Sequence, residues 1–359
     1  MPRFILKVMI LLLITSNDNV MAAYRNIKSN KGSITAGVDK VTIREVEKIE
    51  LRKFLRMINK KFKNYTPEKV RKESIPKPNG KIRVLGIPAL IERIMEQATK
   101  QVLEPIFEAK FYKHSYGFRP GLSQYKAIST ISLLISNGYT YSVDMDVESF
   151  FDNINHSKMI KILWTNGIRD KRLLTIIKKK LKAPIAGVGI PTKGTIQGGV
   201  LSPLLANIYL NELDQWVASQ WTECGLTQNR KKTTKMKRGI IIRYADDFKI
   251  LAKSRNEAKR WFFATEMWLE ERLKLKLSPE KSKITNLKRK CSKFLGIDLR
   301  AVKSRKHKIK HRVCISKVGA EEKEKIYQKY KTGAETLLKN KITLPKWNKF
   351  ISLINGIKN

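Results

Sequence analysis

Cysteine is scarce in this chain, which has three among its 359 residues, at Cys224, Cys291 and Cys314. None belongs to a Cys-x-x-Cys pair, so the sequence indicates neither a zinc module nor a disulfide framework, which is consistent with a reducing compartment. Long apolar runs are missing as well, since no stretch approaches the ~20 apolar residues that span a bilayer. The apolar run 8–14 is short for a secretory signal. We therefore expect a soluble protein.

Acidic residues are also few. The chain has 31 Asp plus Glu against 74 Lys plus Arg, a formal net charge of +43. Such a field attracts polyanions strongly and in a salt-dependent way, so nucleic acid is the leading candidate partner and an anionic membrane surface the second. Hydrophobic residues make up 42% of the chain, enough for a sizeable core, and the length allows two or three domains.

The acids that the chain does have include an adjacent pair, Asp246-Asp247. Apolar residues 240–242 precede the pair, and Phe248 and Ile250 follow it, which predicts a hairpin tip between two strands. Adjacent aspartates repel one another and lose solvation when partly buried, so they favour a counter-charge, and hard divalent cations prefer oxygen ligands. A charged hairpin turn without a metal remains the alternative for the pair taken alone.

A second source of carboxylates lies in residues 139–147, where apolar and polar residues alternate as in a half-buried strand. This period places Asp144 and Asp146 on one face of the strand. Either aspartate could converge with Asp246-Asp247, and the alternation does not choose between them. The sequence thus predicts a carboxylate site built from two segments that are far apart in the chain.

A third segment of interest is cationic. Asn79-Gly80 between two short extended segments predicts a hairpin, and Lys77, Lys81 and Arg83 lie at its tip. These side chains would suit a phosphate chain. A solvated basic turn is an equally good interpretation.

Capping signals and periodicity predict the other elements. They are a helix from Ser16 to Ile27, one long helix from the capping box at Thr42 to about Phe62, a helix from Ser123 to Gly138, helices at 89–107, 157–164, 201–210 and 258–275, a glycine-rich loop at 187–199, a basic loop at 230–238 and a basic strand pair at 288–312.

Several motifs in one order resemble reverse transcriptases, and in particular the protein encoded by group II introns. The resemblance covers roughly residues 19–300. It rests on Asn30-Lys31-Gly32 with Ala36-Gly37-Val38-Asp39, Ile75-Pro76-Lys77-Pro78-Asn79-Gly80-Lys81, Tyr116-Gly117-Phe118-Arg119-Pro120-Gly121, Asp146-Val147-Glu148-Ser149-Phe150-Phe151-Asp152-Asn153-Ile154, Gln197-Gly198-Gly199-Val200-Leu201-Ser202-Pro203-Leu204-Leu205-Ala206-Asn207, Tyr244-Ala245-Asp246-Asp247 and Phe294-Leu295-Gly296. Each motif alone is moderately specific, and the set in order is far more so.

The resemblance implies an α+β fold of the right-hand polymerase type, with fingers and palm as in reverse transcriptases and a partial helical thumb. The implied divisions are an N-terminal extension (1–41), fingers (42–138), a palm (139–312) with a basic loop at 229–239 and a strand-rich basic end at 288–312, and a partial thumb or maturase segment (313–359). Because relatives usually continue further, we expect a short thumb and no endonuclease segment. Ile196 stands where relatives often carry proline.

The resemblance also implies a metal centre. Asp146, Asp246 and Asp247, together with the backbone carbonyl of Val147, would hold two Mg²⁺ ions, with Mn²⁺ as a substitute. Asp146 is preferred over Asp144 because the family's metal aspartate lies five residues before an aromatic residue, which here is Phe151.

Contacts to substrates follow from the same resemblance. Phe151 would crowd a 2′-hydroxyl and so favour deoxynucleotides, and Lys281 would protonate the leaving pyrophosphate. The implied nucleotide-binding residues are Lys77, Arg83, Phe151, Gln197 and Lys281. The implied nucleic-acid contacts are Lys81, Arg119, Arg230, Lys231, Lys232, Arg238, Arg289 and Lys290.

The implied function is an RNA-directed DNA polymerase of a group II intron. It would extend the 3′-OH of a DNA primer with dNTPs on an RNA template and assist splicing and retrotransposition as a maturase bound to intron RNA. The alternatives are an RNA-binding maturase with weak or no polymerase activity, and a domesticated bacterial reverse transcriptase in phage defence or linked to CRISPR. A viral RNA replicase is disfavoured, because Phe151 cannot accept a ribose hydroxyl. We expect no membrane partner and a bacterial cytoplasmic location, with an organelle matrix or stroma as the alternative.

Overall fold

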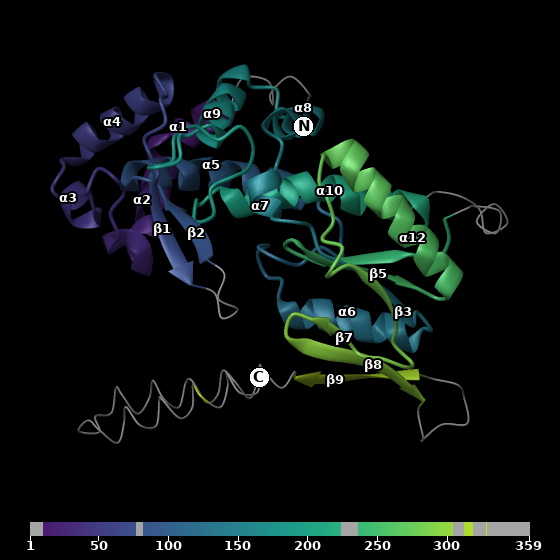
Figure 1. The fold of residues 1–359 in the computed structure, drawn as a ribbon. Coiled ribbons are helices and arrows are strands. Elements are labelled where there is room, and N and C mark those ends of the chain that lie inside the picture. Colours follow the sequence, from purple (N-terminus) through teal and green to yellow (C-terminus); the bar gives the residue numbers. More distant parts are fainter. Residues whose placement is uncertain (1–9, 77–81, 224–235, 304–311, 319–327, 329–359) are drawn as a thin grey trace, which may run out of the picture.

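The computed structural model describes residues 10–76, 82–223, 236–303, 312–318 and 328 (Figure 1). Helices and strands are mixed along the chain, which confirms the predicted α+β class at that level. The described strands form three sheets, ordered β1-β2, β4-β5-β3-β6 and β7-β8-β9. Lys77, Lys81, Arg230, Lys231 and Lys232, which the sequence assigned to substrate contacts, lie outside the described residues.

A layer of helices near the N-terminus packs on the long helix α5 (Leu90–Glu108). The layer consists of α1 (Ile10–Thr15), α2 (Asn17–Ser29), the 3₁₀ turn η2 (Lys31–Ile34), α3 (Ile43–Glu47) and α4 (Leu51–Lys63). The capping box at Thr42 is present, but the predicted single helix from Thr42 to Phe62 is wrong, because α3 ends at Glu47 and α4 begins at Leu51. No glycine or proline marks this break, so the pattern carried no signal for it.

The two strands of the predicted hairpin are present as β1 (Arg71–Pro76) and β2 (Ile82–Ile87), which pair antiparallel with Pro76 opposite Ile82. Its base lies on the glycine-rich loop, where the Gly86 amide donates to the Gln197 carbonyl at 2.7 Å. A Cβ at Gly86 would lie 2.3 Å from Cγ2 of Ile196. The close approach of strand and loop therefore requires a glycine at this position.

The central sheet is antiparallel throughout. It contains β4 (Ile240–Tyr244), β5 (Asp247–Ala252), β3 (Tyr141–Met145) and β6 (Lys283–Asn286). One face packs on α10 (Ser202–Gln220) and α12 (Arg255–Trp268), because alternate strand residues such as Val143 and Ile250 join the core cluster that these helices line. The other face packs on α6 (Gln124–Ser136), where Ile242 and Leu251 belong to a second cluster.

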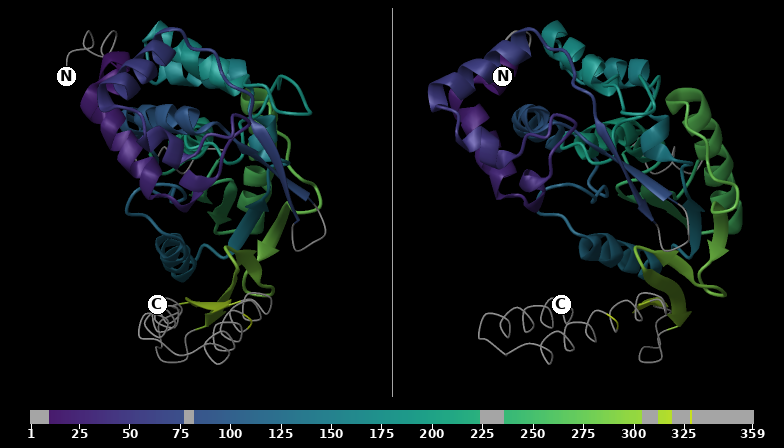
Figure 2. Two further views of the ribbon diagram at one scale, coloured as in Figure 1. Left: turned by 90° about the vertical axis from the view of Figure 1, so that its left-hand side faces the viewer. Right: turned by 60° about the vertical axis from the view of Figure 1, so that its left-hand side comes forward.

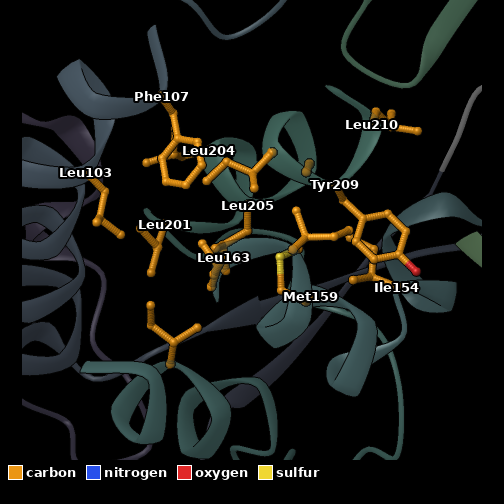
Figure 3. Close-up of a cluster of buried hydrophobic side chains, with 14 of the residues drawn as sticks. Leu103, Phe107, Ile154, Met159, Leu163, Leu201, Leu204, Leu205, Tyr209 and Leu210 are labelled. Carbon is orange, nitrogen blue, oxygen red and sulfur yellow. The ribbon is translucent and has the colours of Figure 1, made fainter. Parts of the chain in front are cut away.

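Three helices connect the central sheet to the glycine-rich loop: α7 (Phe150–Asn153), α8 (His156–Thr165) and α9 (Lys171–Leu181). Their buried residues meet those of α5 and α10 in a core that includes Phe107, Met159 and Leu205 (Figure 3). The sequence analysis missed α9, although it begins at a clear N-cap signal: the Asp170 carboxylate accepts from the amides of Arg172 and Leu173.

The chain after α12 continues through a π-helical turn (Leu269–Leu273) and the strands β7 (Ser292–Phe294), β8 (Ile297–Lys303) and β9 (Arg312–Val318). The predicted strand pair in the basic region is thus present, and the expected division after residue 312 falls at the start of β9. Figure 2 shows the N-terminal helices and strand β8 at opposite ends of the molecule. Among the described residues, no helix is long and apolar enough to cross a membrane.

Candidate active site

Three aspartates gather at the edge of the central sheet, where β3 ends and the β4–β5 hairpin turns. Asp246 lies in the turn, Asp247 is the first residue of β5, and Asp146 directly follows β3. Met145 is opposite Phe248 in the sheet, so continuing this register by one residue brings Asp146 beside Asp247. We call Asp146, Asp246, Asp247 and the nearby Lys281 the carboxylate edge.

The aspartates of the carboxylate edge act on one another electrostatically. Although Asp247 is solvent-exposed, nearby protein displaces some of its water, and this desolvation, followed by the charges of Asp246 and Asp146, raises the pKa of the Asp247 carboxyl. A positive charge placed among these carboxylates would relieve the repulsion. The predicted convergence of two distant segments on one site is therefore present in the fold.

Asp146 already has one cationic neighbour. The ammonium Nζ of Lys281 lies 2.9 Å from Oδ2 of Asp146, and its side chain is 69% exposed. The backbone after Asp146 pairs with residues 276–278, because the Glu148 amide donates to the Lys276 carbonyl and the Ser278 amide donates to the Asp146 carbonyl. This bridge does not use the Val147 carbonyl, which was the predicted fourth oxygen ligand.

Asp144, two residues earlier and within β3, has a different environment. Its Oδ1 accepts hydrogen bonds from Lys249 and Ser142, each at 2.5 Å, and its Oδ2 accepts from Ser292 at 2.7 Å and Thr285 at 3.0 Å. We call these five residues the β3 polar cluster. Since both oxygens of Asp144 are occupied by protein donors, the structure favours Asp146 over Asp144 as the member of the carboxylate edge.

Charge in the β3 polar cluster is balanced internally. Burial raises the pKa of Asp144, but the Lys249 ammonium and the hydroxyl donors outweigh burial and hold that pKa below its ordinary value. Lys249 is 4% exposed, and its Nζ also lies 5.4 Å from the centre of the Phe294 ring. The sequence analysis did not identify Lys249, because its partner lies on another strand.

A metal ion is the counter-charge that this chemistry favours, and the donor set can be tested against it. No three His, Cys, Asp or Glu side chains in the described ranges are gathered closely enough to hold a metal ion as they stand. Three carboxylates that repel one another nevertheless form an oxygen donor set of the kind that hard divalent cations prefer. The three carboxylates thus fit such an ion by their donor chemistry, and in the structure the Lys281 ammonium contacts Asp146.

The hairpin turn that carries Asp246 is held by a buried polar network. Arg243 and Asp214 are both 0% exposed and form a bidentate pair with three contacts of 2.7 to 3.0 Å. The same guanidinium donates through Nη1 to Oδ1 of Asn207 and to the carbonyl of Ala245, each at 2.8 Å. Sequence analysis missed Arg243 and Asp214, because their partnership joins β4 to α10 and leaves no local pattern.

The other two predicted palm positions lie beside the glycine-rich loop. Phe151 is half-buried, its ring packs edge-on against Phe150, and its carbonyl accepts from the Thr195 amide at 2.7 Å. Gln197 is in the loop whose Gly198 has φ of +111° and would place a Cβ 2.6 Å from the Gly86 carbonyl oxygen. The loop and the helix that carries Phe151 are therefore tied to each other and to β2.

The predicted basic contacts have varied surroundings. Arg119 is 9% exposed, forms an ion pair with Glu108 and donates to the carbonyls of Tyr112 and Ser115, so its guanidinium already has partners within the fold. Arg238 lies 3.8 Å from Glu257, and Arg289 and Lys290 are exposed in the turn after β6. Arg83 belongs to β2. Their contacts to nucleic acid or nucleotide stay predictions.

Comparisons with known proteins bear on this site. Residues 75–299, which include the carboxylate edge and the glycine-rich loop, match the family model described as reverse transcriptase (RNA-dependent DNA polymerase). The chain is 34% identical over 304 residues to Protein YkfC of Escherichia coli, covering 77% of this chain and 79% of that protein. It is 31% identical over 338 residues to the group II intron-encoded protein LtrA of Lactococcus lactis, covering 80% of this chain.

The chain spans 56% of the length of LtrA. A solved structure titled "Partial Cas6-RT-Cas1--Cas2 complex" matches with 27% identity and a TM-score of 0.40 over 72% of this chain and 40% of that one, a likeness too weak to carry a conclusion. The family match covers most of the chain and contains every described residue of the carboxylate edge. The chain therefore belongs to the reverse transcriptase (RNA-dependent DNA polymerase) family and is similar to its group II intron-encoded members.

Proposed function

We propose that this chain is an RNA-directed DNA polymerase that extends the 3′-OH of a DNA primer with dNTPs on an RNA template. The observation that carries the proposal is the convergence of Asp146, Asp246 and Asp247 at one edge of the central sheet, within a chain that belongs to the reverse transcriptase family. Desolvation, followed by the charges of Asp246 and Asp146, raises the pKa of the Asp247 carboxyl, so these carboxylates favour a further positive counter-charge beside them. Divalent cations, which the family uses, would supply it.

Asp146, Asp246 and Asp247 are the proposed ligands, with the Val147 carbonyl as a further oxygen. A pair of bound Mg²⁺ ions, or Mn²⁺ in their place, would polarise the primer hydroxyl and the triphosphate and neutralise charge on the leaving group. The three carboxylates hold negative charge at the sheet edge only when they are deprotonated. Desolvation and the charges of Asp246 and Asp146 raise the pKa of Asp247, and a bound cation would lower that pKa by favouring the charged carboxylate.

The Lys281 side chain would have two positions: one at Asp146, as in the structure, and one nearer the triphosphate when cations are bound. Its ammonium contacts Asp146 in the structure, and the pKa of Lys281 is raised by that carboxylate. With cations bound at the carboxylate edge, the exposed Lys281 ammonium would be repelled from Asp146 toward the triphosphate. Its ammonium could then donate a proton to the leaving pyrophosphate, as the family resemblance implies.

Phe151 is proposed to select the sugar. Its half-buried ring and the hydrogen bond from the Thr195 amide to its carbonyl fix α7 against the glycine-rich loop. An apolar ring under the incoming sugar would exclude a 2′-hydroxyl and offer it no hydrogen bond. Phe151→Val should raise the use of ribonucleotides relative to dNTPs, measured as the ratio of kcat/KM values, and an unchanged ratio would count against this role.

The division into fingers, palm and a partial thumb is also proposed. The hairpin of β1 and β2 would form part of the fingers, with Arg83 toward a triphosphate, and the central sheet with α10 and α12 would form the palm. Gln197 would lie near the template-nucleotide pair, because its loop contacts β2 on one side and leads into α10 on the other.

The test of the polymerase proposal is primer extension on an RNA template by the purified full chain with dNTPs and Mg²⁺. Wild type should extend the primer, Asp246→Ala should not, and Asp18→Ala should match wild type, because Asp18 is exposed on α2 far from the sheet edge. Equal extension by wild type and Asp246→Ala would contradict the proposal. So would the absence of extension by wild type while the chain still binds the template.

A second candidate function is splicing assistance as an intron maturase. The similarity to LtrA over 80% of this chain favours it, as does the net charge of +43. The chain would bind a structured intron RNA through its basic surface, with affinity that falls steeply as salt rises. Self-splicing of an intron RNA from the same locus should accelerate with wild type and with Asp246→Ala alike, and no acceleration by either would reject the maturase role.

A further inference from the structure

The hairpin turn between β4 and β5 has a strained backbone. Ala245, directly before the aspartate pair, has a φ of +59°, in the left-handed region that non-glycine residues rarely occupy. Such a conformation raises the free energy of the folded chain by about as much as one hydrogen bond lowers it. It persists only when surrounding contacts impose it. The contacts around Ala245 should therefore reveal what fixes the two aspartates.

The contacts come from three elements that are distant in the chain. The Arg243 guanidinium donates to the Ala245 carbonyl at 2.8 Å and also to Asp214 and Asn207 of α10. Asn207 in turn donates to the Gly117 carbonyl at 2.8 Å. Gly117 approaches the turn so closely that a Cβ there would lie 2.3 Å from the Ala245 amide nitrogen.

The backbone of Arg243 is tied to the same loop. Its amide donates to the His114 carbonyl at 3.0 Å, and its carbonyl accepts from the Tyr116 amide at 2.9 Å. Arg243 is thus fixed at both its backbone and its side chain. The hydrogen bond from its Nη1 to the Ala245 carbonyl joins this anchored side chain to the turn.

We infer that Arg243, held by Asp214 and Asn207, is a positioning residue that sets the Ala245 turn so that Asp246 and Asp247 face Asp146. This inference rests on the proposed function, because it presumes that the three carboxylates act together. Catalytic carboxylates need placement to within about 0.5 Å, so a turn that relaxes from its left-handed conformation would lose much of its activity. A lysine cannot replace the arginine, since it lacks the planar fork that meets Asp214, Asn207 and the Ala245 carbonyl together.

A merely structural role for the ion pair makes a different prediction. Replacing a whole buried ion pair by apolar residues of similar size is often neutral for stability, whereas removing one partner leaves a buried charge unpaired. The double variant Arg243→Met with Asp214→Leu should therefore melt higher than either single variant, because it leaves no buried charge unpaired. If the pair only stabilises the fold, the double variant should also recover full activity.

The positioning role predicts that the double variant folds but does not recover activity. Its kcat for primer extension should fall about 100-fold, with the KM for primer-template little changed, because the Ala245 carbonyl has lost its donor. Its affinity for Mn²⁺ should fall about tenfold in a titration that follows free Mn²⁺ by electron paramagnetic resonance. This second measurement does not depend on turnover.

Arg243→Lys keeps the inference testable if the double variant fails to fold. It retains a positive charge opposite Asp214 and should lose at least about tenfold in kcat and weaken Mn²⁺ binding. Wild-type kcat and Mn²⁺ affinity in either folded variant would overturn the inference. Failure of the proposed function is distinguishable, since then wild type and Asp246→Ala would already behave alike in the same assays.

Discussion

Asp144 and Asp146 are two residues apart, and their surroundings differ completely. Asp144 lies in the β3 polar cluster, where one ammonium and three hydroxyl groups satisfy both of its oxygens. Asp146 lies on the carboxylate edge, where its described side-chain ion pair is to a lysine that is 69% exposed. The first carboxylate has its counter-charge inside the fold, whereas the second has an ion-pair partner that is exposed to solvent.

The difference suggests a division of roles over three residues: Asp144 would contribute to stability, and Asp146 would contribute to the proposed reaction. A buried charge with all partners in place is costly to disturb but has no capacity left for substrate. A carboxylate near other carboxylates, with an exposed lysine as its ion-pair partner, should lower the stability of the sheet edge slightly, and we propose that it binds a cation. Substitutions in the two regions should therefore have opposite signatures.

The largest effect is expected at the carboxylate edge. Asp246→Asn should reduce kcat for primer extension by about 10⁴-fold or more, about 5 kcal/mol of transition-state stabilisation, because an amide is a poor ligand for a hard cation. Its melting temperature should stay near that of wild type. Asp298→Asn on β8 is a matched control, and a similar loss of kcat there would indicate a general effect of aspartate removal.

The next largest effect is expected in the β3 polar cluster. Asp144→Ala should lower the free energy of unfolding by about 3 kcal/mol, because it leaves the buried Lys249 ammonium without its carboxylate. Urea unfolding followed by circular dichroism measures this change. The double variant Asp144→Leu with Lys249→Met should recover most of the loss, and if it does not, packing rather than charge sets the stability of this region.

The pH dependence of the free energy of unfolding should differ in sign between the β3 polar cluster and the carboxylate edge. The pKa of Asp144 is lowered in the folded state, so its stabilisation is present above the ordinary aspartate pKa and is lost as pH falls through the lower, folded value. The pKa of Asp247 is raised, so its charge destabilises the fold above the ordinary value. Asp247→Asn should thus stabilise the chain at pH 7, by less than about 1 kcal/mol at this exposed position, whereas Asp144→Asn should destabilise it.

These signs can be read from unfolding curves between pH 3 and pH 7. The stability gap between wild type and Asp144→Asn should narrow as pH falls below about 4. A gap that stays constant with pH would show that Asp144 contributes through shape alone. An Asp247→Asn variant less stable than wild type at pH 7 would show that Asp247 has an uncounted partner.

The smallest effect is expected at Lys281. Lys281→Ala should change the free energy of unfolding by less than about 0.5 kcal/mol, because an exposed ion pair contributes little. It should lower kcat more than it lowers stability if the ammonium assists the leaving group. The matched control is Lys283→Ala, an exposed lysine two residues along the same segment, and equal kcat losses in both variants would remove the special role of Lys281.

Local patterns predicted the parts of this site that depend on local sequence. Alternation in residues 139–147 and the apolar flanks of Asp246-Asp247 gave strands β3, β4 and β5 and the hairpin turn between them. The choice between Asp144 and Asp146 could not be made from alternation, because it depends on Lys249 and Ser292 from other strands. Only the family resemblance favoured Asp146.

Pairings between residues that are far apart in the chain could not be predicted from local sequence patterns, for a physical reason. Arg243 and Asp214 satisfy each other across a strand and a helix, and neither position differs locally from a solvated charge. The break between α3 and α4 has no glycine or proline, so helix periodicity continued through it. By contrast, α9 begins at a local N-cap signal, Asp170, from which the sequence does predict a helix.

The most direct test of the account is a paired measurement on Asp144→Asn and Asp146→Asn, recording primer extension and urea unfolding for each full-length variant. We expect Asp146→Asn to unfold like wild type and to lose primer extension, whereas Asp144→Asn should unfold at a lower urea concentration and, below its unfolding transition, still extend the primer. Full extension by Asp146→Asn, or loss of extension by a folded Asp144→Asn, would contradict the separation of stability from chemistry along β3.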